Sequence, residues 1–211
     1  MRGLYTVTEW IYRFAIVNLL WILFTIAGLV IFGFFPATFA MFAIVRKWIL
    51  GENEFHLLKT FYQYFKDGFV KTNLIGLIVA LTGGIIYIYF QYIQATLDSA
   101  LIFTHIPLYF FMIIALLTFL YLPPVFVHYD VSFFQYFKNA FIIMIMSPVY
   151  TILLAVLVVI IVYILVRIPG AVFFFGGSTL AYSIMQTCYL ASKNFEKRQA
   201  KLTQSEKNLD D

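Results

Sequence analysis

Charged residues are scarce in this chain of 211 residues, and their scarcity excludes most classes of soluble protein. Asp, Glu, Lys and Arg together make up 11% of the sequence, against about 25% in an average soluble domain. Hydrophobic residues make up 63% and aromatic residues 20%. The single cysteine excludes a framework of intrachain disulfides. The composition therefore indicates an integral membrane protein.

The few charges divide the sequence into long charge-free segments. A helix that crosses a hydrocarbon core of about 30 Å needs about 20 mostly apolar residues. Five charge-free segments are long enough, namely 14–45, 72–97, 99–129, 139–166 and 168–192. The first is long for one helix and short for two. Because proline disfavours the α conformation of the residue before it, we expect one helix to end near Phe35 and another to begin at Pro36.

We therefore predict an all-α integral membrane protein, a bundle of six transmembrane helices, or five if the first segment is one kinked span. In the six-helix arrangement a single transmembrane domain covers residues 1–192, and a cytoplasmic tail with charges of both signs covers 193–211. The predicted spans are about 14–32, 36–50, 72–95, 102–122, 140–166 and 169–190.

The distribution of basic residues predicts the orientation, because short cytoplasmic loops retain Lys and Arg. With six spans and a cytoplasmic N-terminus, every Lys and Arg except Arg167 lies inside. The five-span arrangement also leaves Arg2 and Arg13 outside. Both arrangements place the C-terminus in the cytoplasm. The formal net charge of +4 is thus explained by membrane orientation, and it indicates no nucleic-acid partner.

A ten-residue segment occurs twice in the chain. Residues 61–70, FYQYFKDGFV, recur as residues 133–142, FFQYFKNAFI, with six of ten positions identical. The same offset places 36–50 on 108–122. The pattern predicts a duplicated unit of helix, aromatic-basic connector and helix, and the two copies would be parallel repeats related by an axis along the membrane normal.

The two connectors, about 54–71 and 130–139, have a chemistry of their own. Apolar residues in the first fall at helical spacing, which predicts an amphipathic helix in the membrane interface. Such a helix either holds the bundle at headgroup depth or docks a partner on the cytoplasmic face. The candidate docking residues are Phe61, Phe65, Lys66, Phe133, Phe137 and Lys138.

Patterns typical of enzymes and metal sites are missing from the sequence. His56, His105 and His128 share no ligand spacing with one another or with Cys188. No glycine pair is followed by the lysine of a phosphate-binding loop. We therefore expect a protein that is not an enzyme, with no catalytic residues, metal or cofactor.

Neutral polar residues within the predicted spans are the candidates for an intramembrane site. Asn18, Thr38 and Asn73 form the set that we select, because they could meet across the first three helices. Hydrogen bonding between helices would equally explain them. No acidic residue lies at the middle of a predicted span, which disfavours ion-coupled transport.

Small residues and proline predict local helix geometry. Gly76, Ala80 and Gly84 recur every four residues, which is typical of a face where two helices pack closely. Pro148 lies inside the fifth predicted span. Because proline has no N–H, we expect a kink there that frees the carbonyl of Met144.

The sequence contains four short motifs, NLLW at 18–21, FGFFPATFA at 32–40, RKW at 46–48 and FKDGFVKTN at 65–73. In this order they resemble the YesL-like family of bacterial integral membrane proteins. The resemblance covers mainly residues 1–80, while chain length and span pattern agree over the rest. It implies a multi-pass protein of the bacterial cytoplasmic membrane with unknown biochemical activity, often encoded beside carbohydrate-uptake transporters and glycan-degrading enzymes. It implies no catalytic residues.

The resemblance and the connectors together lead to a functional hypothesis. We expect a non-enzymatic accessory or assembly factor associated with carbohydrate uptake, whose partners are the lipid bilayer and subunits of an ATP-driven sugar transporter. The alternative is a small stand-alone transporter or channel, with a neutral polar path between the two repeats for a neutral solute.

Overall fold

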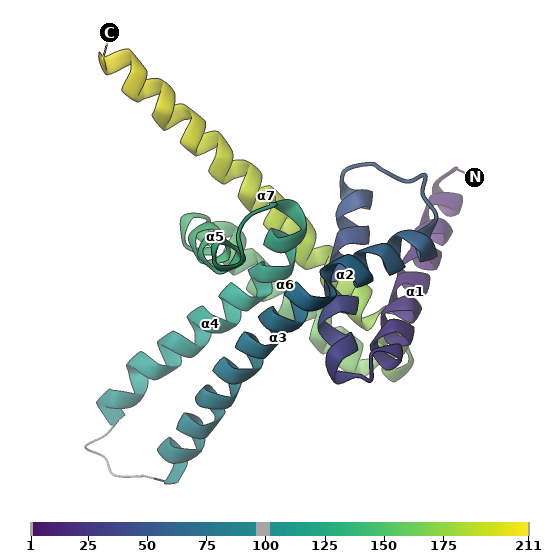
Figure 1. The fold of residues 1–211 in the computed structure, drawn as a ribbon, viewed down its shortest axis with the longest axis horizontal. Helices are drawn as coiled ribbons and strands as arrows, with labels where there is room; N and C mark the ends of the chain where they lie inside the picture. The colour runs from purple at the N-terminus through teal and green to yellow at the C-terminus, as the bar shows by residue number, and fades with distance from the viewer. Residues whose placement is uncertain (1, 96–101, 211) are drawn as a thin grey trace.

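The fold consists of helices joined by short connections. The computed structural model describes the backbone of residues 2–95 and 102–210, and side chains within 7–92, 106–168 and 170–197. All regular secondary structure in these ranges is α-helical, which confirms the predicted class. The helices are α1 (Arg2–Ala27), α2 (Ile31–Ile49), α3 (Leu57–Ala95), α4 (Ile102–His128), α5 (Phe133–Met146), α6 (Pro148–Arg167) and α7 (Pro169–Asp210) (Figure 1).

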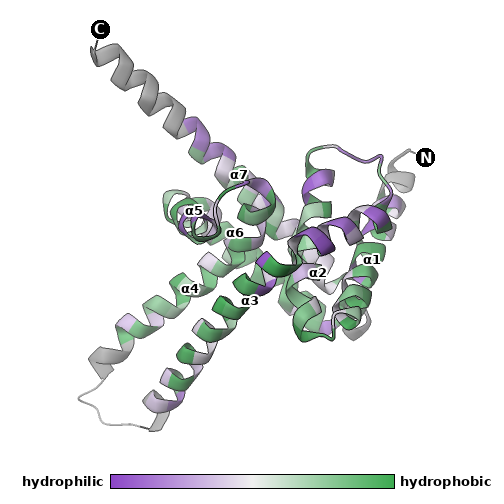
Figure 2. Ribbon diagram, in the orientation of Figure 1, coloured by the Kyte–Doolittle hydropathy of each residue, from purple (hydrophilic) through white to green (hydrophobic). Residues whose placement is uncertain are grey.

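Five of these helices, α1, α2, α3, α4 and α6, are long and apolar enough to cross a membrane. Hydrophobic residues dominate them, whereas hydrophilic residues gather in the α2–α3 connection, the first part of α3 and the part of α7 beyond the core (Figure 2). The sixth predicted span, 169–190, is the first half of α7. The predicted tail continues that helix as far as Asp210, and its last residue, Asp211, lies outside the described residues.

Helices α1 and α2 form an antiparallel hairpin whose turn lies at 28–30, not near Phe35 as predicted. A Cβ added to Gly28 would stand 2.3 Å from the Cα of Gly33, so the two backbones touch where only glycine fits. Leu29 and Val30 complete the turn with positive φ angles of 58° and 65°. The prediction was wrong because Pro36 lies inside α2 rather than at its start.

Helix α3 crosses the α1–α2 hairpin and then continues past it (Figure 1). Near its start, the rings of Phe61 and Phe65 each lie 5.1 Å from the ring of Phe24 in α1. Farther along, Gly76 packs against the ring of Phe35 in α2. Residues 57–71 of the first predicted connector are therefore the beginning of α3 and not a separate helix.

The predicted small-residue face holds at one of its three positions. A Cβ on Gly76 would lie 2.2 Å from the ring of Phe35, so glycine is required there. Ala80 is exposed, and a Cβ on Gly84 would meet nothing within 4 Å among the described atoms. The four-residue spacing continues, but α3 has by then left the hairpin.

The predicted span 140–166 is divided between α5 and α6, which meet at Ser147. Pro148 is the first residue of α6, where its missing N–H costs little. The carbonyl of Met144 accepts a hydrogen bond from Thr151 Oγ1 at 2.8 Å. The predicted release of this carbonyl is thus confirmed, and a side chain from the next helix replaces the lost N–H.

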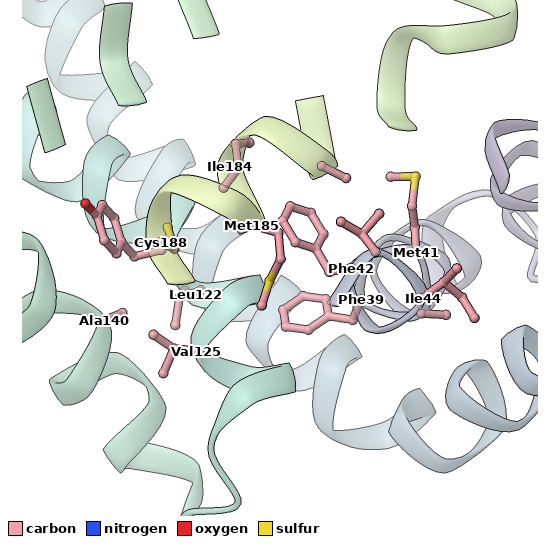
Figure 3. Packing of buried hydrophobic residues seen from close by; sticks show 14 of the residues in the cluster. Phe39, Met41, Phe42, Ile44, Leu122, Val125, Ala140, Ile184, Met185 and Cys188 are labelled. Atoms are coloured by element: carbon pink, nitrogen blue, oxygen red, sulfur yellow. The ribbon is translucent and has the colours of Figure 1, made fainter. Parts of the chain in front are cut away.

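The hydrophobic core lies around α2, between α1, α3, α4 and α7. Within the most apolar part of α2, 61% of residues are buried, against 11% in α1, α3 and α6. Figure 3 shows Phe39 and Phe42 of α2 beside Met185 of α7, with Leu122 of α4 nearby. In the other apolar helices most hydrophobic side chains are exposed or only partly buried, as expected for surfaces that face lipid.

Candidate functional site

The three polar residues predicted to form one intramembrane site bond to three different places. Thr38 accepts a hydrogen bond from Trp21 Nε1 at 3.0 Å and donates to the carbonyl of Phe34. Asn18 bonds to α7, and Asn73 bonds to the start of α2. The three side chains therefore do not form one site. Each makes its own contact between two helices, which is what the alternative explanation, interhelical hydrogen bonding, predicts.

Asn18 joins α1 to the first half of α7. Its Nδ2 donates to the carbonyl of Phe173 at 2.6 Å, and its Oδ1 accepts from the N–H groups of Gly177 at 2.9 Å and Ser178 at 3.1 Å. Asn18 is fully buried. A Cβ on Gly177 would lie 3.0 Å from Oδ1, so glycine gives the amide access to the backbone of α7.

Asn73 repairs the hydrogen-bond ladder of α2. Pro36 has no N–H to offer to the carbonyl of Phe32, four residues earlier. Asn73 Nδ2 from α3 donates to this carbonyl at 3.0 Å and also to the carbonyl of Phe69 at 2.9 Å. An unsatisfied carbonyl is costly in an apolar environment. The bond explains how α2 continues through a proline.

This pairing gives a testable coupling between Asn73 and Pro36. We expect Asn73→Leu to lower the free energy of unfolding by about 1–2 kcal/mol in the natural chain, because it leaves the carbonyl of Phe32 without a donor. In a Pro36→Ala background the new backbone N–H supplies that donor, so Asn73→Leu should cost clearly less. Titration with a denaturing detergent measures both values, and equal losses in the two backgrounds would contradict the assignment.

An apolar cavity of about 540 Å³ lies among α1, α2, α4, α6 and α7. Trp21 and Thr38 are the polar side chains in its lining, and they bond to each other. The remaining lining residues are apolar or glycine. The cavity therefore offers a polar solute few hydrogen-bonding partners, which is unlike the path that the transporter alternative requires.

A second cavity, of about 320 Å³, lies between the two copies of the sequence repeat. Tyr64 and Tyr136, which occupy the same position in FYQYFKDGFV and FFQYFKNAFI, both line it. Helices α2 and α4 complete the walls. The lining residues are Phe39, Ala43, Arg46, Tyr64, Asp67, Gly68, Lys71, Phe126, Val127, His128, Tyr129, Asp130 and Tyr136.

Four charged residues line this cavity without forming ion pairs. The ion pairs within the described part of the chain are Arg13 with Glu9 and Lys47 with Glu52. Arg46 instead donates from Nε to Nδ1 of His128 at 3.4 Å. The other three charged residues, all exposed, are Asp67, Lys71 and Asp130.

Tyr129 attaches the rim of the cavity to α7. Its hydroxyl donates to a carboxylate oxygen of Glu196 at 2.9 Å. Burial, more than the neighbouring carboxylate, raises the pKa of Tyr129 to about 12. The phenol therefore stays protonated, and able to donate, across the physiological pH range.

Comparison with known proteins identifies the family. A family model described as "Protein of unknown function, DUF624" matches residues 14–90. Uncharacterized protein YteU of Bacillus subtilis (strain 168) is 39% identical over 189 residues, which cover 86% of this chain and 81% of YteU. Uncharacterized protein YesL of the same organism is 32% identical over 203 residues, covering 95% of this chain and 94% of YesL. The chain belongs to the DUF624 family. No solved structure matches it significantly.

The resemblance to YesL-like proteins is thus confirmed. Asn18, Thr38 and Asn73 of this DUF624 chain lie within the matched residues 14–90. The residues of α2 and α3 that line the second cavity, which we call the charged cavity, also lie within the match. Its other lining residues, from α4, α5 and the connection between them, lie beyond the match. Among the described residues, no group of three His, Cys, Asp or Glu side chains is placed to hold a metal ion.

The predicted docking residues on the connectors are mostly turned inward. Phe61 is fully buried, and Phe65, Phe133 and Phe137 are half-buried. The most exposed aromatic residue of each repeat is the next one along the chain, Tyr62 in α3 and Phe134 in α5, at 53% and 79% exposure. Lys66 and Lys138 are exposed one helical turn farther on.

These exposed residues form two equivalent pairs, Tyr62 with Lys66 and Phe134 with Lys138, which we call the aromatic–lysine pairs. Within each pair the residues are four apart on a helix, so they share one face. The repeated sequence indicated the two positions, but helical spacing alone did not separate the inward aromatic residue from the outward one.

Proposed function

We propose that this protein is a non-enzymatic accessory factor of a carbohydrate-uptake system in the bacterial cytoplasmic membrane, and that the aromatic–lysine pairs dock a permease subunit of an ATP-driven sugar transporter. The observation that carries the proposal is the exposure of both pairs at equivalent repeat positions. The YesL-like resemblance supplies the class of partner.

The chemistry of the pairs suits a protein partner. An exposed aromatic ring supplies a large contact area at low entropic cost, and aromatic residues dominate binding hot spots. A lysine beside it favours a partner surface with acidic residues and speeds encounter. At the start of α5 the Ser132 N–H donates to the side chain of Gln135 at 3.1 Å, which orders the turn that presents Phe134.

The first test of the proposal is co-purification. We expect the double variant Tyr62→Ala with Phe134→Ala to weaken binding to the permease by at least about tenfold, because two hot-spot side chains are lost. Tyr89→Ala is the matched control, since Tyr89 is 55% exposed on the same helix α3 but outside the repeat. The affinity of the purified full-length protein for the permease subunit in lipid nanodiscs is the measurement. Equal binding by the double variant and the control would refute the docking assignment.

The second test separates an accessory factor from a transporter. Uptake of radiolabelled oligosaccharides is compared in cells with and without this protein, each with the neighbouring permease present or deleted. The proposal requires that the protein change uptake only when the permease is present. Uptake that persists without the permease and depends on this protein would instead favour the stand-alone transporter.

A further inference from the structure

The charged cavity between the repeats has a balanced set of unpaired charges. The cavity has a volume of about 320 Å³. Arg46 and Lys71 supply two cations to its lining, and Asp67 and Asp130 supply two carboxylates. None of the four forms an ion pair within the described part of the chain. A purely anionic ligand would meet the two carboxylates, and a purely cationic ligand would meet the two basic groups. The electrostatics therefore favour a ligand that carries both charges.

The aromatic lining suits the cationic part of such a ligand. The ring of Phe126 lies 4.9 Å from the ring of Phe39 and 4.8 Å from that of Tyr136, measured between centroids. Tyr64 from the other repeat lines the same space. Ammonium groups bind over aromatic faces, and quaternary ammonium ligands are often held by several aromatic rings. A nearby carboxylate strengthens this attraction.

The basic groups suit an anionic part. Arg46 lies three residues before the end of α2. Its Nε bonds to His128 Nδ1, and its two terminal guanidinium nitrogens have no hydrogen-bond partner among the described residues. A guanidinium presents a forked pair of donors that matches a phosphate or a carboxylate. Lys71 adds a second positive charge to the same cavity.

The position of the cavity matches the depth of a lipid headgroup. His128 ends the apolar segment of α4, and Asp130 follows two residues later. Arg46 lies in the last turn of α2, another helix apolar enough to cross the membrane. The cavity is thus formed where apolar helices end, and polar groups there face the interfacial layer of a bilayer.

We propose that this cavity binds a zwitterionic ligand with an ammonium group and a phosphate or carboxylate group. The ammonium group lies near Asp67, Asp130 and the aromatic rings, and the anionic group lies near Arg46 and Lys71. A phosphoethanolamine headgroup has this chemistry, whether it belongs to a membrane lipid or is free in the cytoplasm. The proposal does not depend on the proposed accessory function.

Native mass spectrometry of the full-length protein in detergent tests the proposal with three probes. Dihexanoyl phosphatidylethanolamine carries both charges, dihexanoyl phosphatidylglycerol carries the phosphate without the ammonium, and phosphoethanolamine is the headgroup without the lipid. We expect the ethanolamine lipid to bind at least about tenfold more tightly than the glycerol lipid. Equal affinity for the two lipids, or no binding of any probe, would overturn the proposal. Tighter binding of the ethanolamine lipid than of free phosphoethanolamine would identify a membrane lipid as the source of the zwitterion. Equal or tighter binding of free phosphoethanolamine would identify the soluble headgroup.

Variants of exposed residues assign the two ends of the ligand. The double variant Asp67→Asn with Asp130→Asn should lose about tenfold in affinity for the ethanolamine lipid and lose its preference over the glycerol lipid. Lys71→Gln should weaken both lipids. Lys59→Gln, which removes another exposed charge of α3 outside the cavity lining and outside the aromatic–lysine pairs, is the control and should leave both affinities unchanged. A preference that survives in the double variant would exclude the assigned orientation.

Discussion

Replacing Asn18 by Asp is expected to destabilise the protein by several kcal/mol at pH 7. The two side chains have the same shape, but aspartate has no N–H to donate to the carbonyl of Phe173, which the Asn18 amide contacts at 2.6 Å. The substitution also places a negative charge at a fully buried position. Burial of an unpaired charge is among the most costly changes in a protein. Asn18 joins α1 to α7, so we expect the loss of that contact to open the bundle.

Acid should partly restore the Asn18→Asp variant. At low pH the carboxyl group at position 18 is protonated and carries no charge. The protonated carboxyl group then donates to the carbonyl of Phe173 and accepts from the backbone of α7, as the amide does. This contribution is therefore present in acid and is lost as the pH rises and the carboxyl group ionises.

The measurement is thermal unfolding in detergent between pH 4 and pH 8, compared with the natural chain. Gln63→Glu is the matched control, because it makes the same change from amide to carboxylate at an exposed position of α3. A variant at position 18 that unfolds at the natural temperature at pH 7, or that gains nothing from acid relative to the control, would contradict the role of the amide.

Replacing Thr151 by Val is expected to lower the free energy of unfolding by about 2–4 kcal/mol. The Thr151 hydroxyl donates to the carbonyl of Met144 at 2.8 Å and lies 2.9 Å from the hydroxyl of Tyr121. Tyr121 is fully buried. Valine has nearly the same shape but no hydroxyl, so it leaves a carbonyl and a phenol unsatisfied in the core where α5 meets α6.

Two further variants isolate this effect. Thr82→Val removes a hydroxyl that donates only to the carbonyl of Ile78 in its own helix, and it should cost no more than about 0.5 kcal/mol. Thr151→Ser retains the hydroxyl and should recover part of the loss. Titration with a denaturing detergent gives the three values. A Thr151→Val loss as small as that of Thr82→Val would show that the break at Pro148 needs no side-chain donor.

The two prolines show how far local sequence reasoning reached. The rule that proline frees the carbonyl four residues earlier predicted the release of Met144 correctly, and the helix does break beside Pro148. The same kind of rule misplaced the first break, because Pro36 lies inside α2. The difference is a long-range contact. Asn73 of α3 satisfies the carbonyl that Pro36 frees, and no pattern near residue 36 announces it.

The candidate sites show the same division. The repeat marked positions 61–70 and 133–142 as equivalent, and Tyr64 and Tyr136 indeed line one cavity. Helical spacing placed Phe61 among the docking residues, but Phe24 of α1 packs on its ring and buries it. Which aromatic residue faces outward depends on the neighbouring helix that covers the others. Aromatic residues occur on all sides of α3, so their spacing in the sequence does not show which of them is exposed.

Composition and charge spacing by themselves determined that this is an all-α membrane protein, because a hydrocarbon core admits only backbones that satisfy their own hydrogen bonds and few charged groups. The short motifs within residues 18–73 by themselves indicated the family to which the chain belongs. The tertiary structure alone decided that Asn18, Thr38 and Asn73 serve three separate contacts, and that Arg46, Asp67, Lys71 and Asp130 surround one cavity. These residues are distant in the chain. Their meeting depends on how α3 crosses the α1–α2 hairpin, which is a result of packing between helices and not of any local pattern.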